Sequence, residues 1–197
     1  MYLDLETGGV NPKLSAILQL SAGVEIDGKI VDCFEIFMKP FPDDEVEDGA
    51  LSHNHITRED IKTDKFINPV VGYEMFIAFM SKYVDKFNKE DKFQLIGFGI
   101  DAFDEQFMRR WFIRNGEDKY FNSWFHNPSI DLKTLAAYAL RKKRSKLGKF
   151  RLIDVCRYMG IEIDESQVHN STYDIGLCYH VYNEIDKLLQ QGDTQSV

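Results

Sequence analysis

The feature that most constrains the fold is residues 16–38, which form an extended pattern with a tight-turn signal in its middle. Asp27-Gly28 is a two-residue hairpin signal between two strand-like arms. Residues 2–5 predict a short buried strand that runs into the Gly8-Gly9 turn. Together these segments predict three antiparallel strands at the start of the chain.

Helical patterns follow. In residues 69–87, apolar side chains recur at three- and four-residue steps, behind Asn68 as a cap and Pro69 at the first helical position. Further helices are expected at residues 102–114, 132–141, 152–159 and 172–189. Short strands are expected at residues 93–98 and, as an edge strand, at residues 129–131. The Pro-containing, acidic residues 40–48 predict an irregular loop.

The mixture of strands and helices predicts a single α/β domain over residues 1–191, followed by a short polar tail over residues 192–197. A chain of 197 residues, 44% hydrophobic and 28% charged, suits one ordinary globular domain. Cys33, Cys156 and Cys178 lie far apart, which argues against a disulfide framework or a structural zinc site. No apolar run approaches the ~20 residues that span a bilayer. We therefore expect a cytoplasmic protein with no membrane partner.

Asp4-Leu5-Glu6 is the strongest local chemical signal. Residues i and i+2 of a strand project from the same face, so Asp4 and Glu6 place two carboxylates side by side. Such a pair needs protonation, a basic partner or a bound cation, and hard divalent ions prefer oxygen ligands of this kind. The alternative is a strand end that is simply solvated.

Two further segments carry candidate residues. Asp104 opens a predicted helix that follows a buried strand. Its side chain either faces the strand ends or is only an acid in the first helical turn, favoured there by the helix dipole. In the segment His169 to Asp174, Asn170 and Ser171 are natural helix caps. If the helix starts at Ser171 or just after it, His169 lies in the preceding loop and can converge with Asp174. Otherwise the segment is a capped helix with an incidental histidine.

The motifs DLETGG, IDAFDEQF and HNSTYD, in this order, resemble the three motifs of the DEDDh family of 3′→5′ exonucleases. This resemblance covers nearly the whole chain. It implies a ribonuclease H-like fold, with a mixed sheet of about five strands flanked by helices and a site at the ends of the central strands. The segment 51–60 also resembles a connecting segment of these proteins.

The resemblance also implies roles for individual residues. The metal-binding carboxylates would be Asp4, Glu6, Asp104 and Asp174, and the general base would be His169. Two Mg²⁺ ions would act in one site, with Mn²⁺ able to replace them. The side chains expected to contact the substrate are Leu5, Thr7, Phe103 and Phe107.

The activity implied is metal-dependent release of nucleoside 5′-monophosphates from the 3′ end of DNA, as in replication or repair, with a polymerase as a possible partner. An exoribonuclease of the same fold is the closest alternative, because the metal chemistry does not distinguish the two sugars. A catalytically silent domain that binds nucleic acid or a polymerase is the alternative from another class.

The chain departs from the family pattern at two places. Gly99-Ile100 stands where a His-Asn pair is common, and Gly8 stands where a second Thr is usual. Two other features have simpler explanations. Residues His53-Asn54-His55 read HNH, which is the name of another nuclease motif, but the ββα-metal context of that motif is not visible in this sequence. Residues 141–151 contain seven basic residues among eleven, and are either a solvated helix face or a tether for backbone phosphates.

Overall fold

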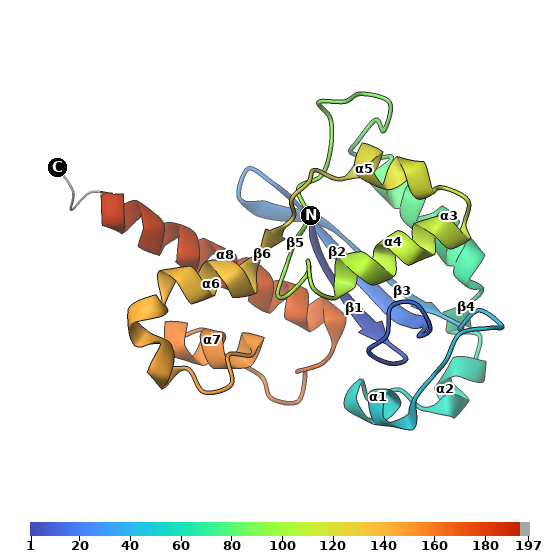
Figure 1. Cartoon of the computed structure of the whole chain (residues 1–197), viewed down its shortest axis with the longest axis horizontal. Helices are drawn as coiled ribbons and strands as arrows, with labels where there is room; N and C mark the ends of the chain where they lie inside the picture. The colour runs from blue at the N-terminus through green and yellow to red at the C-terminus, as the bar shows by residue number, and fades with distance from the viewer. Residues whose placement is uncertain (194–197) are drawn as a thin grey trace.

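A six-stranded mixed sheet runs through the molecule, with helices against both of its faces (Figure 1). The computed structural model describes the backbone of residues 1–193 and the side chains of residues 1–117 and 119–190. The strand order is β4-β3-β2-β1-β5-β6. The strands are β1 (Tyr2–Thr7), β2 (Ile17–Ile26), β3 (Lys29–Met38), β4 (Phe66–Ile67), β5 (Ile96–Gly97) and β6 (Ile130–Asp131).

The first three strands are antiparallel to one another, and the three short strands pair in parallel with their neighbours. Asp27 (φ 51°) and Gly28 (φ 76°) form the turn between β2 and β3, both in the left-handed region. A two-residue turn of this kind matches the right-handed twist of a hairpin. The predictions of three antiparallel strands and of a last edge strand at β6 are confirmed.

Helices cover the sheet in two groups. In Figure 1, α3 and α4 lie on one side of β1, and α6, α7 and the long α8 lie on the other. The α-helices are α1 (Asp48–His53), α2 (Arg58–Lys62), α3 (Pro69–Met80), α4 (Asp104–Arg114), α5 (Phe121–Trp124), α6 (Leu132–Ala139), α7 (Leu152–Met159) and α8 (Ser171–Asp193). Two 3₁₀ segments, η1 (Asp118–Tyr120) and η2 (Arg141–Lys146), complete the described elements. The predicted α/β class is confirmed.

The alternation of side chains along β1 places its residues in two different environments. Leu3 and Leu5 enter the main core, which is rich in aromatic side chains from α3 and α4. Tyr2 points the other way, into a smaller cluster with Ile175 and Cys178 of α8. Because successive side chains of a strand alternate, Asp4 lies on the Tyr2 face, towards α8.

Several boundaries differ from the sequence predictions. α3 ends at Met80 rather than at residue 87, because the next residues are held by tertiary contacts: the Tyr83 hydroxyl donates to Asp32 on β3 at 2.8 Å. The loop predicted at residues 40–48 ends as α1 begins at Asp48, and β4 was not predicted. α1 and β4, with six and two residues, carry too short a repeat to be recognised on periodicity alone.

At the C-terminal end, α8 continues to Asp193, past the predicted helix end at residue 189 and into the predicted tail. Residues 194–197 of that tail lie outside the described residues. Within residues 1–193, none of the helices combines the length and the apolar character that a membrane crossing requires.

The contact between β5 and β1 yields a stability prediction. A Cβ atom at Gly97 would lie 2.9 Å from the backbone oxygen of Leu3, whereas one at Gly176 in α8 would meet nothing within 4 Å. We expect Gly97→Ala to lower the free energy of unfolding by about 1–3 kcal/mol through overpacking. Gly176→Ala should raise it by about 0.5–1 kcal/mol, because a helical glycine costs backbone entropy. Urea denaturation of both variants tests this, and equal effects would contradict it.

Candidate active site

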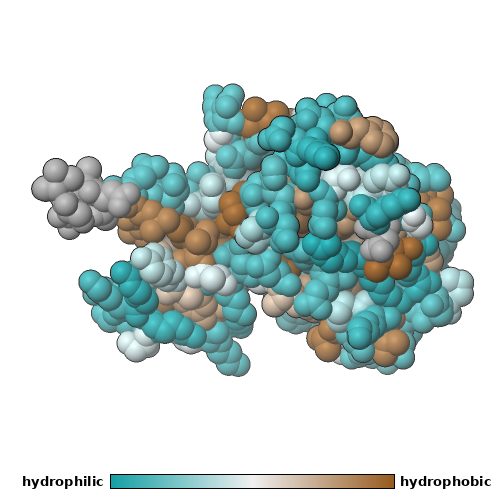
Figure 2. All heavy atoms as spheres, turned by 45° about the horizontal axis from the view of Figure 1, so that its top comes forward, coloured by the Kyte–Doolittle hydropathy of each residue, from teal (hydrophilic) through white to brown (hydrophobic). Residues whose placement is uncertain are grey.

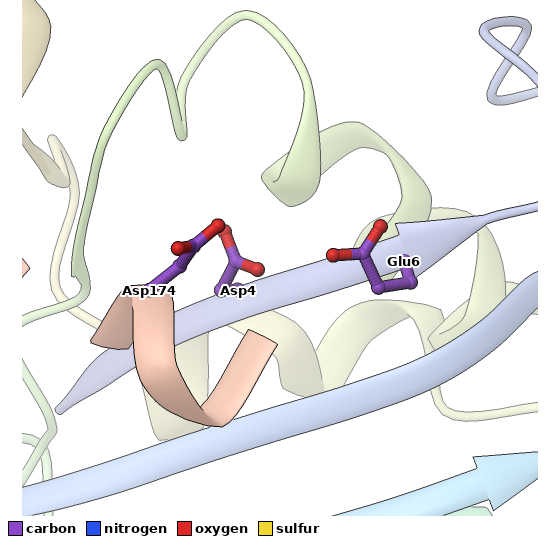
Figure 3. A group of neighbouring side chains, drawn as sticks. All are labelled: Asp4, Glu6 and Asp174. Carbon is purple, nitrogen blue, oxygen red and sulfur yellow. The ribbon is translucent and has the colours of Figure 1, made fainter. Parts of the chain in front are cut away.

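Three carboxylates meet at the end of β1 (Figure 3). Asp4 and Glu6 come from β1 and Asp174 from the first turn of α8, and one oxygen of each lies within 4.8 Å of the other two. In Figure 3, Asp4 and Asp174 point toward one another, and Glu6 lies further along the strand. The prediction that Asp4 and Glu6 share one face of a strand is confirmed.

The start of α8 brings Asp174 and His169 together. Asn170 caps the helix, because its side-chain oxygen accepts the backbone N–H groups of Thr172 (3.1 Å) and Tyr173 (3.2 Å). His169 precedes the cap and has a φ of 67°, in the left-handed region that residues other than glycine rarely adopt. Since the helix begins after His169, the five-residue separation from Asp174 does not turn the two side chains apart. The predicted arrangement of this segment is confirmed.

A buried hydroxyl pair fixes that first turn of α8 to the sheet. The hydroxyls of Ser21 on β2 and Ser171 share a hydrogen bond of 2.6 Å, and Ser21 also lies 3.0 Å from the Thr172 hydroxyl. Thr172 in turn donates to Glu35 on β3 at 2.6 Å. This network holds the start of α8 over the sheet. No local pattern predicts it, because Ser21 and Ser171 are 150 residues apart.

The carboxylates lie at a cavity of about 590 Å³. Its lining consists of Asp4, Leu5, Glu6, Thr7, Gly9, Val10, Glu47, Gly49, Ala50, His53, Asn54, Phe103, His169 and Asp174. The ring centroids of His53 and His169 are 3.9 Å apart and the ring planes are inclined at 47°, so the two imidazoles are in tilted contact at the wall. Asn54 donates to the backbone oxygen of Thr7 at 2.8 Å and joins α1 to β1.

His53, Asn54 and Glu47 were not among the predicted site residues. For His53 and Asn54, the signal that could have found them is the resemblance of residues 51–60 to a connecting segment of the exonucleases, whereas Glu47 precedes that segment and had no signal. Among the predicted substrate contacts, Leu5, Thr7 and Phe103 do line the cavity. Phe107 does not: its side chain is 1% exposed and packs in the main core beside Phe103. Phe107 thus lies away from the cavity lining, and its contact with a substrate stays a prediction.

Asp104 lies next to the three-carboxylate group but outside it. Its side chain is 6% exposed, and one oxygen accepts the backbone N–H of Leu5 at 3.2 Å. It is absent from the cavity lining. Its negative charge nevertheless raises the pKa of Asp4, so the two carboxylates interact directly. Its role as a metal ligand stays a prediction.

The two departures from the family pattern have structural explanations. A Cβ atom at Gly8 would lie 3.0 Å from the backbone oxygen of Glu45, so a threonine has no room there. Gly99 has a φ of 84°, and the Ile100 side chain is fully buried in the main core. Neither position offers a polar side chain to a bound nucleotide.

The carboxylates are difficult to ionise together. Burial and the charges of Asp104, Glu6 and Asp174 raise the pKa of Asp4 well above its usual value. Burial followed by the charges of Asp174 and Asp104 raises the pKa of Glu6 to about 8. Burial also raises the pKa of Asp104 to about 7 and that of Asp174 to about 6.

A divalent cation fits this donor set. Within the described part of the chain, no Lys, Arg or His forms an ion pair with any of the four carboxylates. One oxygen of Asp174 is buried without a hydrogen-bond partner. Oxygen donors that carry uncompensated negative charge are the ligands that Mg²⁺, Mn²⁺ and Ca²⁺ prefer.

His169 is suited to accept a proton. Burial lowers its pKa, and the neighbouring His53, His55 and Arg151 lower it further. The imidazole is therefore mostly neutral at neutral pH, with a nitrogen lone pair free to act as a base.

A carboxylate cluster beside a neutral histidine, in a cavity at the end of a central strand, is the kind of site found in metal-dependent hydrolases. The family model named exonuclease matches residues 1–182, and the chain belongs to this family. The predicted family is confirmed.

Curated relatives fall into two groups. The chain is 27% identical over 184 residues to ribonuclease T of Buchnera aphidicola, an alignment that covers 88% of this chain and 76% of that protein. It is 26% identical over 179 residues to the PolC-type DNA polymerase III of Mycoplasmopsis pulmonis. That alignment covers 91% of this chain but only 11% of the polymerase.

Solved structures of exonuclease I share the fold. A complex of the Escherichia coli enzyme with a dT13 oligonucleotide superposes with a TM-score of 0.78 at 23% identity, over 98% of this chain and 42% of that one. A second exonuclease I structure gives a TM-score of 0.76 at 25% identity over the same shares. The chain thus spans less than half of exonuclease I. The predicted ribonuclease H-like fold is confirmed, with six strands rather than about five.

The raised pKa values predict how stability depends on pH. Because the folded carboxylates bind protons more tightly than the unfolded ones, whose pKa is about 4, the metal-free protein loses stability as pH rises. The loss runs through the pKa values of about 6 for Asp174 and about 8 for Glu6. We expect the melting temperature without metal to fall between about pH 5 and about pH 8.5. Calorimetry in EDTA measures it.

Added Mg²⁺ should raise the melting temperature more at the upper end of this range, because cations and protons compete for the same oxygens. Asp4→Asn should flatten the pH dependence, whereas Asp64→Asn, at an exposed carboxylate away from the cavity, should leave it unchanged. A metal-free melting temperature that rises with pH would contradict the assignment.

Proposed function

We propose that the chain is a metal-dependent 3′→5′ exonuclease that hydrolyses the terminal phosphodiester bond of DNA and releases nucleoside 5′-monophosphates. The observation that carries the proposal is the group formed by Asp4, Glu6 and Asp174, crowded within 4.8 Å at a cavity whose wall carries His169. Membership of the exonuclease family supports the same reaction.

The carboxylates would hold the metal. Asp4, Glu6 and Asp174 supply the converging oxygens, and Asp104 lies behind them as a further acidic group. We propose two Mg²⁺ ions, replaceable by Mn²⁺, as the ions bound. Bound divalent cations supply positive charge to the phosphate oxygens of the scissile group, where negative charge develops during hydrolysis.

His169 would be the general base. Its neutral imidazole can take a proton from the attacking water, and such a group contributes about 10²–10⁴-fold to a rate. The neighbouring His53 ring, in tilted contact, restricts how the His169 ring can turn. The left-handed backbone of His169 and the capped helix that follows it also fix the backbone position from which the imidazole projects.

The cavity would hold the terminal nucleotide. Its volume of about 590 Å³ lies in the usual range for sites that bind small ligands. Phe103 is half-buried at its lining, where an aromatic face can stack on a base. Leu5 and Thr7 line the floor beside the carboxylates.

RNA is the second candidate substrate. The similarity to a PolC-type DNA polymerase supports DNA as the substrate and a polymerase as a partner. The similarity to ribonuclease T, which covers more of the relative's own length, supports RNA. Digestion of 3′-labelled DNA and RNA of one sequence, side by side, distinguishes the two. In either case we place the activity in the cytoplasm.

The reaction itself can be tested with end-labelled substrates. With Mg²⁺, we expect 3′-labelled single-stranded DNA to lose its label as mononucleotides at once, while 5′-labelled DNA shortens gradually. EDTA should stop both, and so should Asp4→Ala, because it removes a central carboxylate. Cleavage in the middle of the strand, or activity that survives in EDTA, would rule out the proposal.

The role of His169 has its own test. His169→Ala should lower kcat by about 10²–10⁴-fold, because the base is lost while the carboxylates remain. Mn²⁺ affinity, measured by calorimetry, should stay within about threefold of wild type, a change of under 1 kcal/mol. His126→Ala, at an exposed histidine outside the cavity, serves as the control. A His169→Ala variant with the kcat of wild type would remove histidine from the mechanism.

A further inference from the structure

The connection between α6 and α7 presents a rigid basic surface. We call residues 141–151 the basic run; they comprise η2 and the turn that leads into α7. Leu147 and Phe150 within it are 2% and 4% exposed, because they are buried in the core between α6, α7 and α8. With these two side chains anchored inward, all seven basic residues of the run are exposed.

Most of this positive charge is not neutralised by the fold. Arg151 pairs with Asp154, and Arg144 lies over the ring of Phe150. Four lysines of the run have no hydrogen-bond or ion-pair partner among the described side chains: Lys142, Lys143, Lys146 and Lys149. The arginines of α4 behave differently, since each is paired with a carboxylate, as Arg110 is with Asp44 at 2.7 Å.

The rest of the chain is strongly acidic. The net charge of −8 already includes the seven positive charges of the basic run, so the remaining residues carry −15. The acidic remainder of the protein repels a polyanion, and the basic run attracts it. A surface that concentrates positive charge without internal partners is complementary to a phosphate backbone, whose contacts come chiefly from Lys and Arg.

The last residue of the basic run lies within electrostatic reach of the candidate active site. This residue, Arg151, caps α7, and α7 packs against α8, whose first turn carries Asp174. The charge of Arg151 also acts on His169 at the wall of the cavity. Figure 1 shows the α6–α7 connection at the lower left, while α8 begins nearer the centre, close to the end of β1. The corresponding end of the surface in Figure 2 is hydrophilic.

We propose that the basic run binds the phosphate backbone of a single-stranded nucleic acid on the 5′ side of the nucleotide held in the cavity. This inference rests on the proposed function, because a strand whose 3′ end occupies the cavity must leave it in the 5′ direction. The basic run then supplies affinity that grows with substrate length, and the cavity supplies the contacts to the terminal nucleotide.

The test replaces the four unpaired lysines together: Lys142→Gln, Lys143→Gln, Lys146→Gln and Lys149→Gln. The matched control replaces four other exposed lysines that form no ion pair: Lys29→Gln, Lys89→Gln, Lys119→Gln and Lys133→Gln. Both sets lower the net charge equally and differ in location. Fluorescence anisotropy with a long oligothymidylate, on an Asp4→Ala background, measures binding over a range of salt concentrations.

If each lysine contacts one phosphate, the slope of log K against log salt becomes shallower by about 3 in the first variant, at about 0.7 per phosphate of a single strand. The control should keep the wild-type slope. In otherwise wild-type chains, KM should rise for the long oligothymidylate and much less for a dinucleotide. Equal slopes in the two variants, or equal KM changes for both substrates, would overturn the inference.

The same measurements separate this inference from the proposed function. Hydrolysis of the dinucleotide with Mg²⁺ tests the reaction without the basic run. A protein that cleaves nothing, yet shows the shallower slope only in the first variant, supports the binding surface and contradicts the exonuclease. A protein that cleaves both substrates, with slopes that do not differ, contradicts the binding surface alone.

Discussion

Mutual repulsion among the carboxylates at the end of β1 is the constraint that the rest of the structure must overcome. Two unit charges about 4 Å apart repel by about 4 kcal/mol at an effective dielectric constant near 20. Asp4, Glu6 and Asp174 are this crowded, and no basic side chain among the described residues balances them. Packing elsewhere in the fold must therefore offset the free-energy cost of this cluster, which only bound protons or cations lower. Groups destabilised in this way mark functional sites.

Two sets of contacts hold the cluster together, both between α8 and the sheet. The hydroxyls of Ser21 and Ser171 fix the first turn of α8 beside β2. Further along the helix, the Tyr2 ring packs edge-on against Tyr179 and Tyr182. With α8 fixed at two points, Asp174 keeps its position against β1 before any cation binds, which is the preorganisation that a metal site needs.

How much could be predicted from the sequence depended on the range of the interaction. The pairing of Asp4 with Glu6 follows from the two-residue period of a strand, and the convergence of His169 with Asp174 from the caps at Asn170 and Ser171. Phe103 and Phe107 share one helical stripe, and only the placement of α4 decides which of them borders the cavity. Contacts between distant segments, such as that between the His53 and His169 rings, left no local pattern to recognise.

The residues of the site also lie far apart along the chain. Asp4 is synthesised 170 residues before Asp174, which lies on the last helix of the described structure. Because a chain folds as it emerges from the N-terminus, the strands can assemble while the third carboxylate and the histidine are still unmade. A nascent chain that ends before α8 lacks Asp174, so the three-carboxylate group can form only after synthesis has passed the first turn of this helix.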